Sequence, residues 1–522
     1  MRLFTTVAAL QCYLNSHRSV RPRIEIGLVP TMGALHQGHL SLIERARQEN
    51  ALVVVSIFVN PLQFGPSEDF QKYPRSLERD RQLCAEAGVD AIFAPAATEM
   101  FPVEDVAAIL NTQAATERVT VVPPTAMAER LCGKARPGHF EGVCTVVAKL
   151  LNLVGPTKAY FGQKDAQQVA IVQRLGADLN FPGEIVACPT VREPSGLACS
   201  SRNQYLTPEQ QEQATVLFRS LRQAQQVFLK GERRATELLE AVRAELAKMP
   251  EVQAEYVELV DPKTLQPLAE VEEAGLLAVA ARVGSTRLID NLILRNRLPI
   301  VAIDGPAGAG KSTVTRLAAK TLGLLYLDTG AMYRAVTWLV LQSGIALEDE
   351  PAIAELVSQC HIEFKHENSQ TRIEINGQDV TTAIRSSEVT AKVSAVAAQP
   401  AVRSLMLKQQ RQYGRQGGIV AEGRDIGTNV FPDAEVKVFL TASLSERARR
   451  RLLELKEQGR GEMSLEQLER EIAERDEKDS TREVAPLRKA TDAVEIQTDG
   501  LSIEEVLHRI VSLYQERSSP QR

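Results

Sequence analysis

Aromatic residues and histidines are scarce in this sequence, and none of its cysteines are closely paired. Only 5% of the 522 residues are aromatic, and histidine and cysteine occur seven times each. The cysteines are scattered without a CxxC spacing, which argues against a structural zinc site and is typical of reduced thiols in a cytosol. We therefore expect a cytoplasmic protein without structural zinc.

Long hydrophobic runs and a strong charge of one sign are also missing. No run of about 18 apolar residues occurs, so no membrane span is predicted. The opening segment, Met1–His17, lacks a small-residue cleavage site and is interpreted as part of the first domain. A net charge of −5 provides no basic surface for nucleic acid, although local cationic sites can still bind small anions. We expect small-molecule substrates and neither a nucleic-acid nor a membrane partner.

The length of the chain and the pattern of its first part predict several domains of α/β type. A chain of 522 residues exceeds one ordinary core, so roughly two to four domains are expected. Over residues 1–203, strand-like runs alternate with amphipathic stretches, which predicts a parallel, Rossmann-like sheet. The predicted strands are Ile24–Pro30, Leu52–Val59, Ala91–Phe93, Ala159–Phe161 and Glu184–Cys188. The predicted helices are His39–Asn50, Ser76–Ala87, Gly142–Leu153 and Asp165–Leu179.

The pattern changes twice further along the chain. Residues 204–296 are interpreted as a small α+β subdomain that caps the first domain and ends near Leu288–Leu294. Its predicted elements are the helices Pro208–Lys230 and Ala235–Lys248 and the strands Ala254–Val260 and Gly275–Ala281. A new strand, Pro299–Asp304, then opens a third segment, residues 297–522. Because no Gly/Ser-rich spacer separates the two halves, we expect a restricted arrangement of them and no flexible tether.

A glycine-rich loop follows the strand that ends at Asp304. The run Gly305-Pro306-Ala307-Gly308-Ala309-Gly310-Lys311-Ser312 fits GxxxxGK[ST], and a predicted helix, Ser312–Leu322, comes next. Such a loop turns its backbone N–H groups toward phosphate oxygens, while Lys311 reaches the outer phosphates and Ser312 supplies a hydroxyl ligand for Mg²⁺. The predicted ATP site consists of these eight residues and Thr313.

Arginines that follow the next strands indicate a second phosphorylated substrate. The segments Leu327–Arg334 and Ala421–Thr428 each follow a predicted strand and contain arginine. Planar guanidinium groups suit this task because they bind phosphate bidentately. A later helical pair, residues 445–482, is rich in arginine and is broken around Gly459–Gly461. This pattern is typical of a lid that closes over the transferring phosphoryl group.

The segment Ile300–Tyr514 resembles bacterial cytidylate kinase, a P-loop nucleoside monophosphate kinase, and includes a strand-rich nucleotide-binding insertion at residues 360–382. The resemblance implies phosphorylation of CMP or dCMP by ATP with Mg²⁺, with Lys311 as a catalytic residue. It implies that CMP is held by Thr329, Tyr333, Arg334, Ser394, Arg403, Arg424 and Asp425, and that Arg450, Arg475 and Arg482 are lid residues. Glu422 and Asn429 occupy motif positions that also accept Asp and Val, so no catalytic weight is placed on them.

Two histidines follow the first predicted strand of the N-terminal domain. His36 and His39 are separated by Gln37-Gly38, which gives the pattern HxGH at the start of a predicted helix. Imidazoles in that position can donate hydrogen bonds to phosphates while negative charge grows on a departing pyrophosphate. The competing interpretation, two unrelated surface histidines, is disfavoured by the rarity of histidine in the chain. HxGH is typical of nucleotidyl transfer, a superfamily that includes class I aminoacyl-tRNA synthetases.

Four further runs narrow the resemblance. They are Phe58–Phe64, Arg136–Val143, Phe161–Gln168 and Cys199–Asn203. Together with the HxGH run they resemble pantothenate synthetase, the pantoate–β-alanine ligase family, across residues 1–294. The resemblance implies that pantoate and ATP form a pantoyl adenylate, which β-alanine then attacks with release of AMP.

The resemblance also implies roles for individual residues. His36, His39 and Lys164 would be catalytic, and Asn60, Gln63 and Gln168 would hold pantoate or β-alanine. The implied ATP site comprises Met32, Gly33, Ala34, Leu35, His36, Gln37, Gly38, His39, Gly162, Gln163, Lys164, Asp165, Val191, Cys199, Ser200, Ser201 and Arg202. His139 is either a third phosphate donor or a neighbour of a helix cap, and the second interpretation is favoured.

Two other functions were weighed against a bifunctional enzyme. One half could be a non-catalytic nucleotide-sensing module, but both halves keep their phosphate-handling residues. A tRNA-charging enzyme would need a KMSKS-like lysine loop and a basic face, and the sequence has neither. The resemblance leaves open a homodimer formed through the ligase half.

Overall fold

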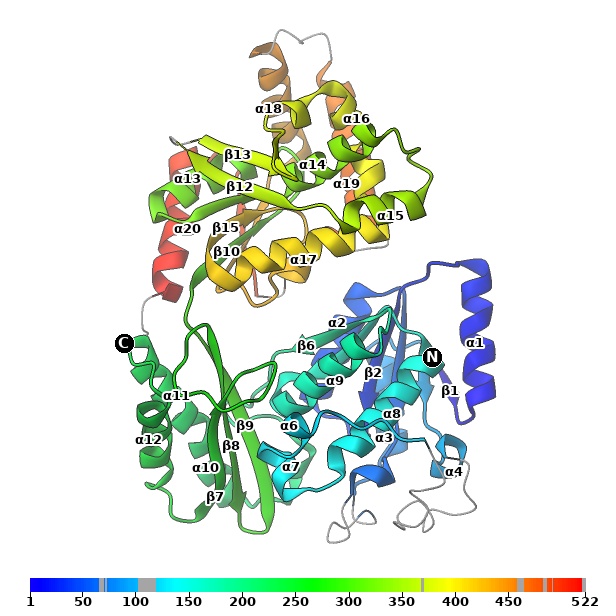
Figure 1. Cartoon of the computed structure of the whole chain (residues 1–522), viewed down its shortest axis with the longest axis vertical. Helices are drawn as coiled ribbons and strands as arrows, with labels where there is room; N and C mark the ends of the chain where they lie inside the picture. The colour runs from blue at the N-terminus through cyan, green and yellow to red at the C-terminus, as the bar shows by residue number, and fades with distance from the viewer. Residues whose placement is uncertain are drawn as a thin grey trace. The chain divides into compact units, whose positions relative to one another are not determined.

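The computed structural model describes residues 1–64, 70, 73–101, 119–367, 370–457, 464–481, 486–490 and 492–518. The chain divides into two units, Met1–Asn296 and Arg297–Arg522 (Figure 1). None of the helices in the described ranges is long and apolar enough to cross a membrane.

A six-stranded parallel sheet forms the centre of the first unit, as its alternating pattern predicts. The strand order is β1-β4-β3-β2-β5-β6. The strands are β1 (Arg2–Phe4), β2 (Ile26–Thr31), β3 (Leu52–Ile57), β4 (Ala91–Phe93), β5 (Lys158–Gly162) and β6 (Glu184–Cys188). Continuous apolar runs such as Leu52–Val55 suit this sheet because its central strands are buried on both faces.

Helices cover both faces of this sheet. On one face, α1 (Val7–Val20), α8 (His139–Val154) and α9 (Ala166–Asp178) pack on Leu28 and Val54. On the other face, α2 (Gln37–Glu49) and α3 (Leu77–Glu86) pack on the strand side chains that point the opposite way, such as Val29 and Val53. The chain leaves the neighbouring strands β2 and β5 toward opposite faces, so their carboxyl ends form a topological switch point. Ligands of open α/β sheets bind at such a point.

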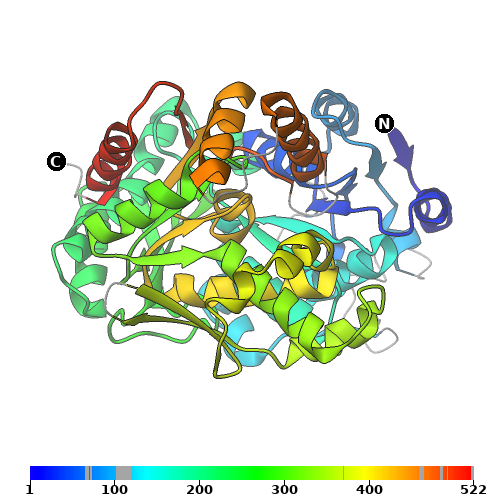
Figure 2. The ribbon, with the colours of Figure 1, turned by 90° about the horizontal axis from the view of Figure 1, so that it is seen from above.

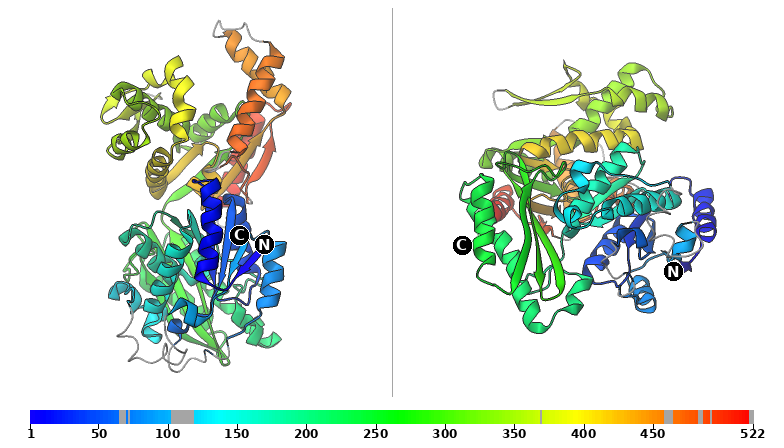
Figure 3. Two further views of the ribbon diagram at one scale, coloured as in Figure 1. Left: turned by 90° about the vertical axis from the view of Figure 1, so that its right-hand side faces the viewer. Right: turned by 60° about the horizontal axis from the view of Figure 1, so that its bottom comes forward.

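A smaller α+β subdomain completes the first unit. Its sheet has the order β7-β8-β9 and is backed by α11 and α12 (Figures 1 and 3). The elements are α10 (Pro208–Ala214), α11 (Val216–Leu229), α12 (Ala235–Leu246), β7 (Val252–Val260), β8 (Ala274–Val283) and β9 (Thr286–Arg295). The predicted helix Pro208–Lys230 was wrong in detail, because it divides at Thr215 into α10 and α11. The prediction of two strands was incomplete, because a third strand, β9, follows a tight Gly284-Ser285 turn.

The second unit is also built on a parallel sheet, with the order β11-β15-β10-β16-β17. Its strands are β10 (Leu298–Asp304), β11 (Leu325–Asp328), β15 (Gly417–Glu422), β16 (Val436–Thr441) and β17 (Val494–Gln497). Helices α13 (Lys311–Leu322) and α20 (Ile503–Ser518) cover one face, and α14 (Thr329–Ser343) and α17 (Pro400–Gln416) cover the other. The P-loop therefore connects the central strand to a flanking helix.

Two appendages extend from this second sheet. The predicted strand-rich insertion forms an antiparallel sheet of β12 (Ile362–Glu367), β13 (Gln370–Ile375) and β14 (Gln378–Asp379), drawn in olive in Figure 2. The arginine-rich segment forms α18 (Leu444–Glu457) and α19 (Leu465–Thr481), which lie side by side in Figure 3 and share a small apolar core. The predicted break at Gly459–Gly461 lies outside the described residues.

The junction between the two units is short. Strand β9 ends at Arg295 and β10 begins at Leu298. The Asn296 Nδ2 atom donates to the carbonyl oxygen of Glu272 at 2.8 Å, and Arg297 Nη1 donates to the carbonyl oxygen of Gly414 at 2.6 Å. Each of the two connecting residues is therefore bonded within its own unit.

Candidate functional site

A tight turn carries the chain from β2 to the histidine pair. Gly33 and Ala34 both have positive φ angles, 81° and 51°. The buried carboxylate of Asp80 accepts hydrogen bonds from the backbone N–H groups of Ala34 and Leu35, both at 2.9 Å. Asp80 was not predicted as a site residue, and it holds the turn that places His36.

His36 and His39 form a capping box at the start of α2. His36 Nδ1 accepts from the backbone N–H of Gly38 at 3.1 Å, and His39 Nδ1 accepts from the backbone N–H of His36 at 3.4 Å. Because both Nδ1 atoms are acceptors, the proton of each neutral ring lies on Nε2. Both Nε2–H groups can then act as donors to a ligand.

Burial keeps both imidazoles neutral. It lowers the pKa of His36 to about 4, with the Lys164 ammonium as a second cause. Burial likewise lowers the pKa of His39 to about 3, and the neighbouring His36 ring adds to the effect. At neutral pH the pair therefore supplies hydrogen-bond donors without adding positive charge to its surroundings.

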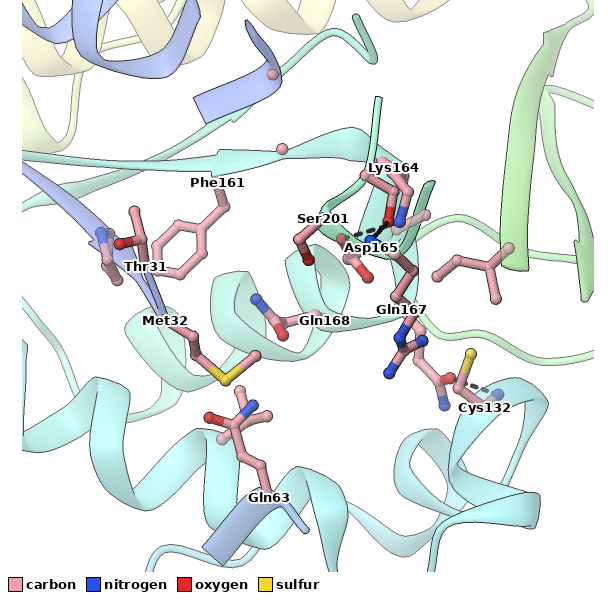
Figure 4. A pocket seen from close by; sticks show the side chains of 18 of the residues that line it. Thr31, Met32, Gln63, Cys132, Phe161, Lys164, Asp165, Gln167, Gln168 and Ser201 are labelled. Carbon is pink, nitrogen blue, oxygen red and sulfur yellow. Dashed lines mark hydrogen bonds and ion pairs between the residues drawn. The ribbon is translucent and has the colours of Figure 1, made fainter. Parts of the chain in front are cut away.

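The end of β5 supplies the next part of the site. A short 3-10 turn, Gln163–Asp165, follows this strand and precedes α9. Within it, Lys164 Nζ lies 3.9 Å from Asp165 Oδ2 (Figure 4). Asn291 of strand β9 donates through Nδ2 to the carbonyl oxygens of both Gln163 and Lys164, at 2.9 Å each. The small subdomain thus fixes the turn that carries the lysine.

The predicted amide residues differ in their placement. Gln63 and Gln168 line the same cavity as Met32 (Figure 4). Asn60 is 1% exposed, and its Nδ2 atom donates to Gln63 Oε1 at 2.9 Å and to the carbonyl oxygen of Gly142 at 3.0 Å. Asn60 therefore orients Gln63 from behind and does not line the cavity.

The cavity has a volume of about 280 Å³ at the carboxyl ends of β2 and β5. Most predicted residues of the first site line it: Met32, His36, Gly38, His39, Gln63, Gly162, Lys164, Asp165, Gln168, Val191, Cys199, Ser200, Ser201 and Arg202. Gly33, Ala34, Leu35, Gln37 and Gln163 belong to the same loops but are not lining residues. Leu35 instead packs into the core beneath α2.

The small subdomain contributes lining residues that no motif indicated. Tyr256 and Arg287 face Cys132, with the Tyr256 hydroxyl 3.2 Å and both Arg287 Nη atoms 3.6 Å from Cys132 Sγ. Asp290 also lines the cavity and forms a bidentate ion pair with Arg192, at 2.7 and 2.9 Å. For Arg287 and Asp290 the sequence signal was the polar content of an otherwise apolar strand, β9, whereas Tyr256 of β7 had none.

The second unit places the predicted phosphate loop between β10 and α13. A Cβ atom at Gly305, where φ is 146°, would lie 2.0 Å from the carbonyl oxygen of Leu440, so only glycine fits there. The Lys311 ammonium donates to the carbonyl oxygens of Gly305 and Pro306, both at 2.7 Å. Burial, together with the guanidinium of Arg424, lowers the pKa of Lys311 well below its ordinary value. A bound phosphate would relieve this crowding of positive charge.

Two buried carboxyl groups lie beside the loop. Asp304 accepts from the backbone N–H groups of Ile426 and Gly427, both at 2.7 Å, and burial raises its pKa to about 6. Glu422 lies on β15 opposite Ile303; its Oε1 accepts from the Tyr326 hydroxyl, and its buried Oε2 has no hydrogen-bond partner among the described residues. Burial raises the pKa of Glu422 as well.

Most of the residues predicted to bind a nucleotide gather around β11 and β15. Arg403 Nη2 pairs with Asp425 Oδ2 at 3.1 Å, and its guanidinium lies 5.9 Å from the Tyr333 ring. The buried Thr329 hydroxyl donates to the carbonyl oxygen of Glu422 at 2.7 Å, while Arg334 pairs with Asp328 at 3.1 Å. Ser394 is exposed on α16 (Ser387–Ala397), the helix that precedes α17.

The lid helices bring further arginines to the phosphate loop and to Arg424. Arg424 pairs with Asp479 of α19 at 2.8 Å. Burial lowers the pKa of Arg475, and the positive charge of Arg424 lowers it further. Arg450 donates to the side-chain and carbonyl oxygens of Thr498. Arg447 was not predicted; it donates to the carbonyl oxygen of Ala307 at 3.2 Å and pairs with Asp476 at 2.6 Å. Arg482 lies outside the described residues.

These geometries define two classes of phosphate-handling α/β protein in one chain. The first unit has a parallel sheet with a neutral histidine pair and a lysine at its switch point. The second unit is a P-loop protein with an inserted antiparallel sheet and an arginine-rich helical pair, the architecture of a mononucleotide kinase.

Comparisons with known proteins identify the family. Residues 2–293 match the family model for pantoate-beta-alanine ligase, and residues 301–516 match the model for cytidylate kinase. The chain is 61% identical over 539 aligned residues to the bifunctional pantoate ligase/cytidylate kinase of Trichormus variabilis, covering 99% of this chain and 100% of that protein. It is 59% identical to the Trichodesmium erythraeum protein of the same name, covering 98% of this chain and 97% of that protein. The chain belongs to the family of bifunctional pantoate ligase/cytidylate kinases.

A solved structure is similar to the first unit. The pantothenate synthetase of Thermus thermophilus is 48% identical, with a TM-score of 0.51, and the match covers 56% of this chain and 99% of that one. The predicted α/β fold class is confirmed by this likeness and by the family models. The alternative of a non-catalytic nucleotide-sensing half has no support in these likenesses.

Proposed function

We propose that this chain is a bifunctional enzyme. One activity condenses pantoate with β-alanine through a pantoyl adenylate, with release of pyrophosphate and AMP from ATP. The other transfers the γ-phosphoryl group of ATP to CMP or dCMP. The observation that carries the first activity is the neutral histidine pair at the α2 N-terminus, which lines one cavity together with Lys164 and the amides of Gln63 and Gln168.

The first ligase step needs donors where negative charge develops. A pantoate carboxylate oxygen attacks the α-phosphorus of ATP. The bond between this phosphorus and the oxygen that bridges to the β-phosphorus breaks, and pyrophosphate leaves. The Nε2–H groups of His36 and His39, together with the Lys164 ammonium, suit the growing charge on phosphorus and pyrophosphate. In the second step the β-alanine amine attacks the acyl carbon, AMP leaves, and the amine loses a proton.

The amide residues are assigned to the acid substrate. Gln63 Oε1 already accepts from Asn60, so the Gln63 NH₂ group is the one that can donate to a pantoate oxygen. Gln168 lines the same cavity. Amides bond hydroxyl and carboxylate oxygens without adding a nucleophile that competes with β-alanine.

In the kinase unit, positioning and charge stabilisation account for catalysis. A phosphate oxygen of CMP attacks the γ-phosphorus, and ADP leaves. Lys311 and the guanidinium groups of Arg424 and Arg475 supply positive charge around the transferring group, with Arg450 beside the loop at Gly310. Thr329, Tyr333, Arg334, Ser394, Arg403 and Asp425 are assigned to CMP.

The kinase residues also fit a magnesium ion. Ser312 lies in the first turn of α13 and is a neighbour of Glu422, whose buried Oε2 lacks a hydrogen-bond partner among the described residues. A hydroxyl and a carboxylate are oxygen ligands of the kind that Mg²⁺ prefers. When bound there, the ion would neutralise charge on the outer phosphates of ATP.

The proposal extends to organisation and location. We assign ATP and pantoate binding to residues 1–203, the cap to residues 204–296 and the kinase to residues 297–522, with a homodimer formed through the ligase unit. Both reactions use ATP, and all seven cysteines are unpaired, which suits the reducing cytoplasm.

A substrate panel on the intact chain tests the proposal. Pantoate and ATP alone should release at most one pyrophosphate per active site, AMP and sustained turnover should also require β-alanine, and CDP should form from CMP and ATP. The variants His39→Ala and Lys311→Ala control for each other, since each should lose one activity and keep the other. Normal pantothenate formation by His39→Ala, or normal CDP formation by Lys311→Ala, would contradict the assignment of that residue.

A further inference from the structure

The start of α8 holds the backbone of Gln63. His139, the first residue of this helix, has Nδ1 2.8 Å from the carbonyl oxygen of Gln63. Arg136 Nη2 donates to the same oxygen at 3.2 Å. Arg136 Nη1 lies 3.2 Å from His139 Nε2. One carbonyl oxygen thus receives two donors from the motif Arg136–Val143, to which the proposed reactions assign no role.

The protonation state of His139 follows from its partners. A carbonyl oxygen only accepts hydrogen bonds, so the short contact requires the proton of His139 to lie on Nδ1. Nε2 is then an acceptor, which matches the donating guanidinium of Arg136. The ring is 9% exposed and is held in one tautomer by these two contacts.

The same helix approaches the Gln63 segment at a second point. A Cβ atom at Gly142 would lie 2.3 Å from the carbonyl oxygen of Leu62, so the two backbones are in close contact. The carbonyl oxygen of Gly142 accepts from Asn60, which also holds Gln63 Oε1. Gln63 is therefore fixed at its backbone by Arg136 and His139 and at its side chain by Asn60.

We propose that Arg136 and His139 are positioning residues that hold Gln63 for the hydroxy-acid substrate and have little effect on the binding of ATP. This inference rests on the proposed function, in which Gln63 binds pantoate. The contacts of both side chains with Gln63 form at the start of α8, whereas the ATP residues lie in the segments that follow β2, β5 and β6. Loosening Gln63 weakens binding of the acid substrate without moving the histidine pair.

Two isosteric variants of His139 give opposite results for the two roles that it can have. The amide nitrogen of His139→Asn stands at the position of Nδ1, so this variant keeps the donor to Gln63. The amide of His139→Gln stands at the position of Nε2, so this variant loses the donor to Gln63 and keeps a polar group beside Arg136. If His139 acted by touching substrate through Nε2, the Gln variant would be the active one.

The experiment measures KM for pantoate and KM for ATP in pyrophosphate release by the full chain, with CDP formation as an internal check of folding. We expect His139→Gln to raise the KM for pantoate roughly 10-fold and leave the KM for ATP within about twofold. His139→Asn should stay within about threefold of the original enzyme in both constants.

Two outcomes would overturn the inference. One is a low KM for pantoate in His139→Gln together with a raised one in His139→Asn, and the other is an equal rise of both constants in His139→Gln. Absence of pantoate-dependent pyrophosphate release from the unmodified chain would instead overturn the proposed function, and this inference with it.

Discussion

The rings of His36 and His39 stack with their centroids 4.0 Å apart and their planes inclined by 33°. Each ring is anchored through Nδ1 to a backbone N–H group of the same helix terminus. Burial is the main reason why neither ring takes up a proton easily, and the neighbouring His36 ring adds to this effect at His39. The pair therefore acts as two neutral donors fixed in direction.

The donor of His39 can be separated from its capping role. In His39→Asn, the amide oxygen still accepts from the His36 backbone N–H, but no group remains at the position of Nε2. We expect the rate of pantoate-dependent pyrophosphate release to fall ~10²–10³-fold, as when one oxyanion donor is removed. CDP formation by the same preparation should be unchanged, and a ligase rate within a few-fold of the original would contradict the role of His39.

The low pKa values of His36 and His39 predict the pH dependence of the first unit. Because their pKa values are about 4 and about 3, against an ordinary 6.5, the unfolded chain binds more protons than the folded chain below pH 6.5. The stability of the unit should therefore fall as the pH drops from 6.5 toward 4. Above pH 7 this pair should add nothing to the pH dependence of stability.

Proton NMR of the imidazole groups checks this prediction. The signals of His36 and His39 should keep their chemical shifts from pH 7 to pH 5 in the folded protein. In urea the same signals should titrate near the ordinary value of 6.5. A normal titration in the folded state would show that the pair is charged at mildly acidic pH.

Asp80 should matter to the ligase although it lies behind the histidine loop. In Asp80→Asn, an NH₂ group replaces one of the two oxygens that accept from Ala34 and Leu35. Two donors then face each other in a buried site, which should cost ~1–3 kcal/mol of stability. Urea unfolding of the first unit and the ligase rate measure the effect. The matched control is Asp178→Asn, which alters a half-exposed pair with Arg174 and should change neither.

Glu422 should set the magnesium requirement of the kinase. Glu422→Gln keeps the shape of the side chain and removes its charge, so the Mg²⁺ concentration for half-maximal CDP formation should rise ~10-fold. Tyr326→Phe is the control, because it removes the hydroxyl that donates to Glu422 and keeps the carboxylate. Mn²⁺ binding followed by electron paramagnetic resonance gives a second readout, and unchanged metal affinity would contradict the assignment.

The loops that follow β2 and β10 could be located from the sequence because their patterns are local. Gly305–Ser312 and Thr31–His39 each lie within one strand–loop–helix connection, so the spacing of glycine, lysine and histidine is sufficient to recognise them. The parallel sheets were predictable for a similar reason, since buried strands such as β3 read as continuous apolar runs.

The supporting residues could not be predicted because they reach the loops from distant parts of the chain. Asp80 bonds Leu35 across 45 residues, and Asn291 bonds Gln163 across 128 residues. Strand β9 was missed because Arg287, Asp290 and Asn291 interrupt its apolar pattern, and all three line the cavity. The division between α10 and α11 has no sequence signal; at Thr215 the backbone bonds Glu212, three residues back, in place of the helical fourth.

The two-residue junction also determines how the chain responds to proteases. Proteases cut preferentially at exposed, mobile loop tips. At the junction, one strand ends at Arg295 and the next begins at Leu298, and the side chains of Asn296 and Arg297 are both hydrogen-bonded. Digestion of the intact chain should therefore cut other loops before it releases a separate ligase and kinase. A shortened protein whose chain is ended inside β9 or β10 will lose part of the strand pairing of that sheet.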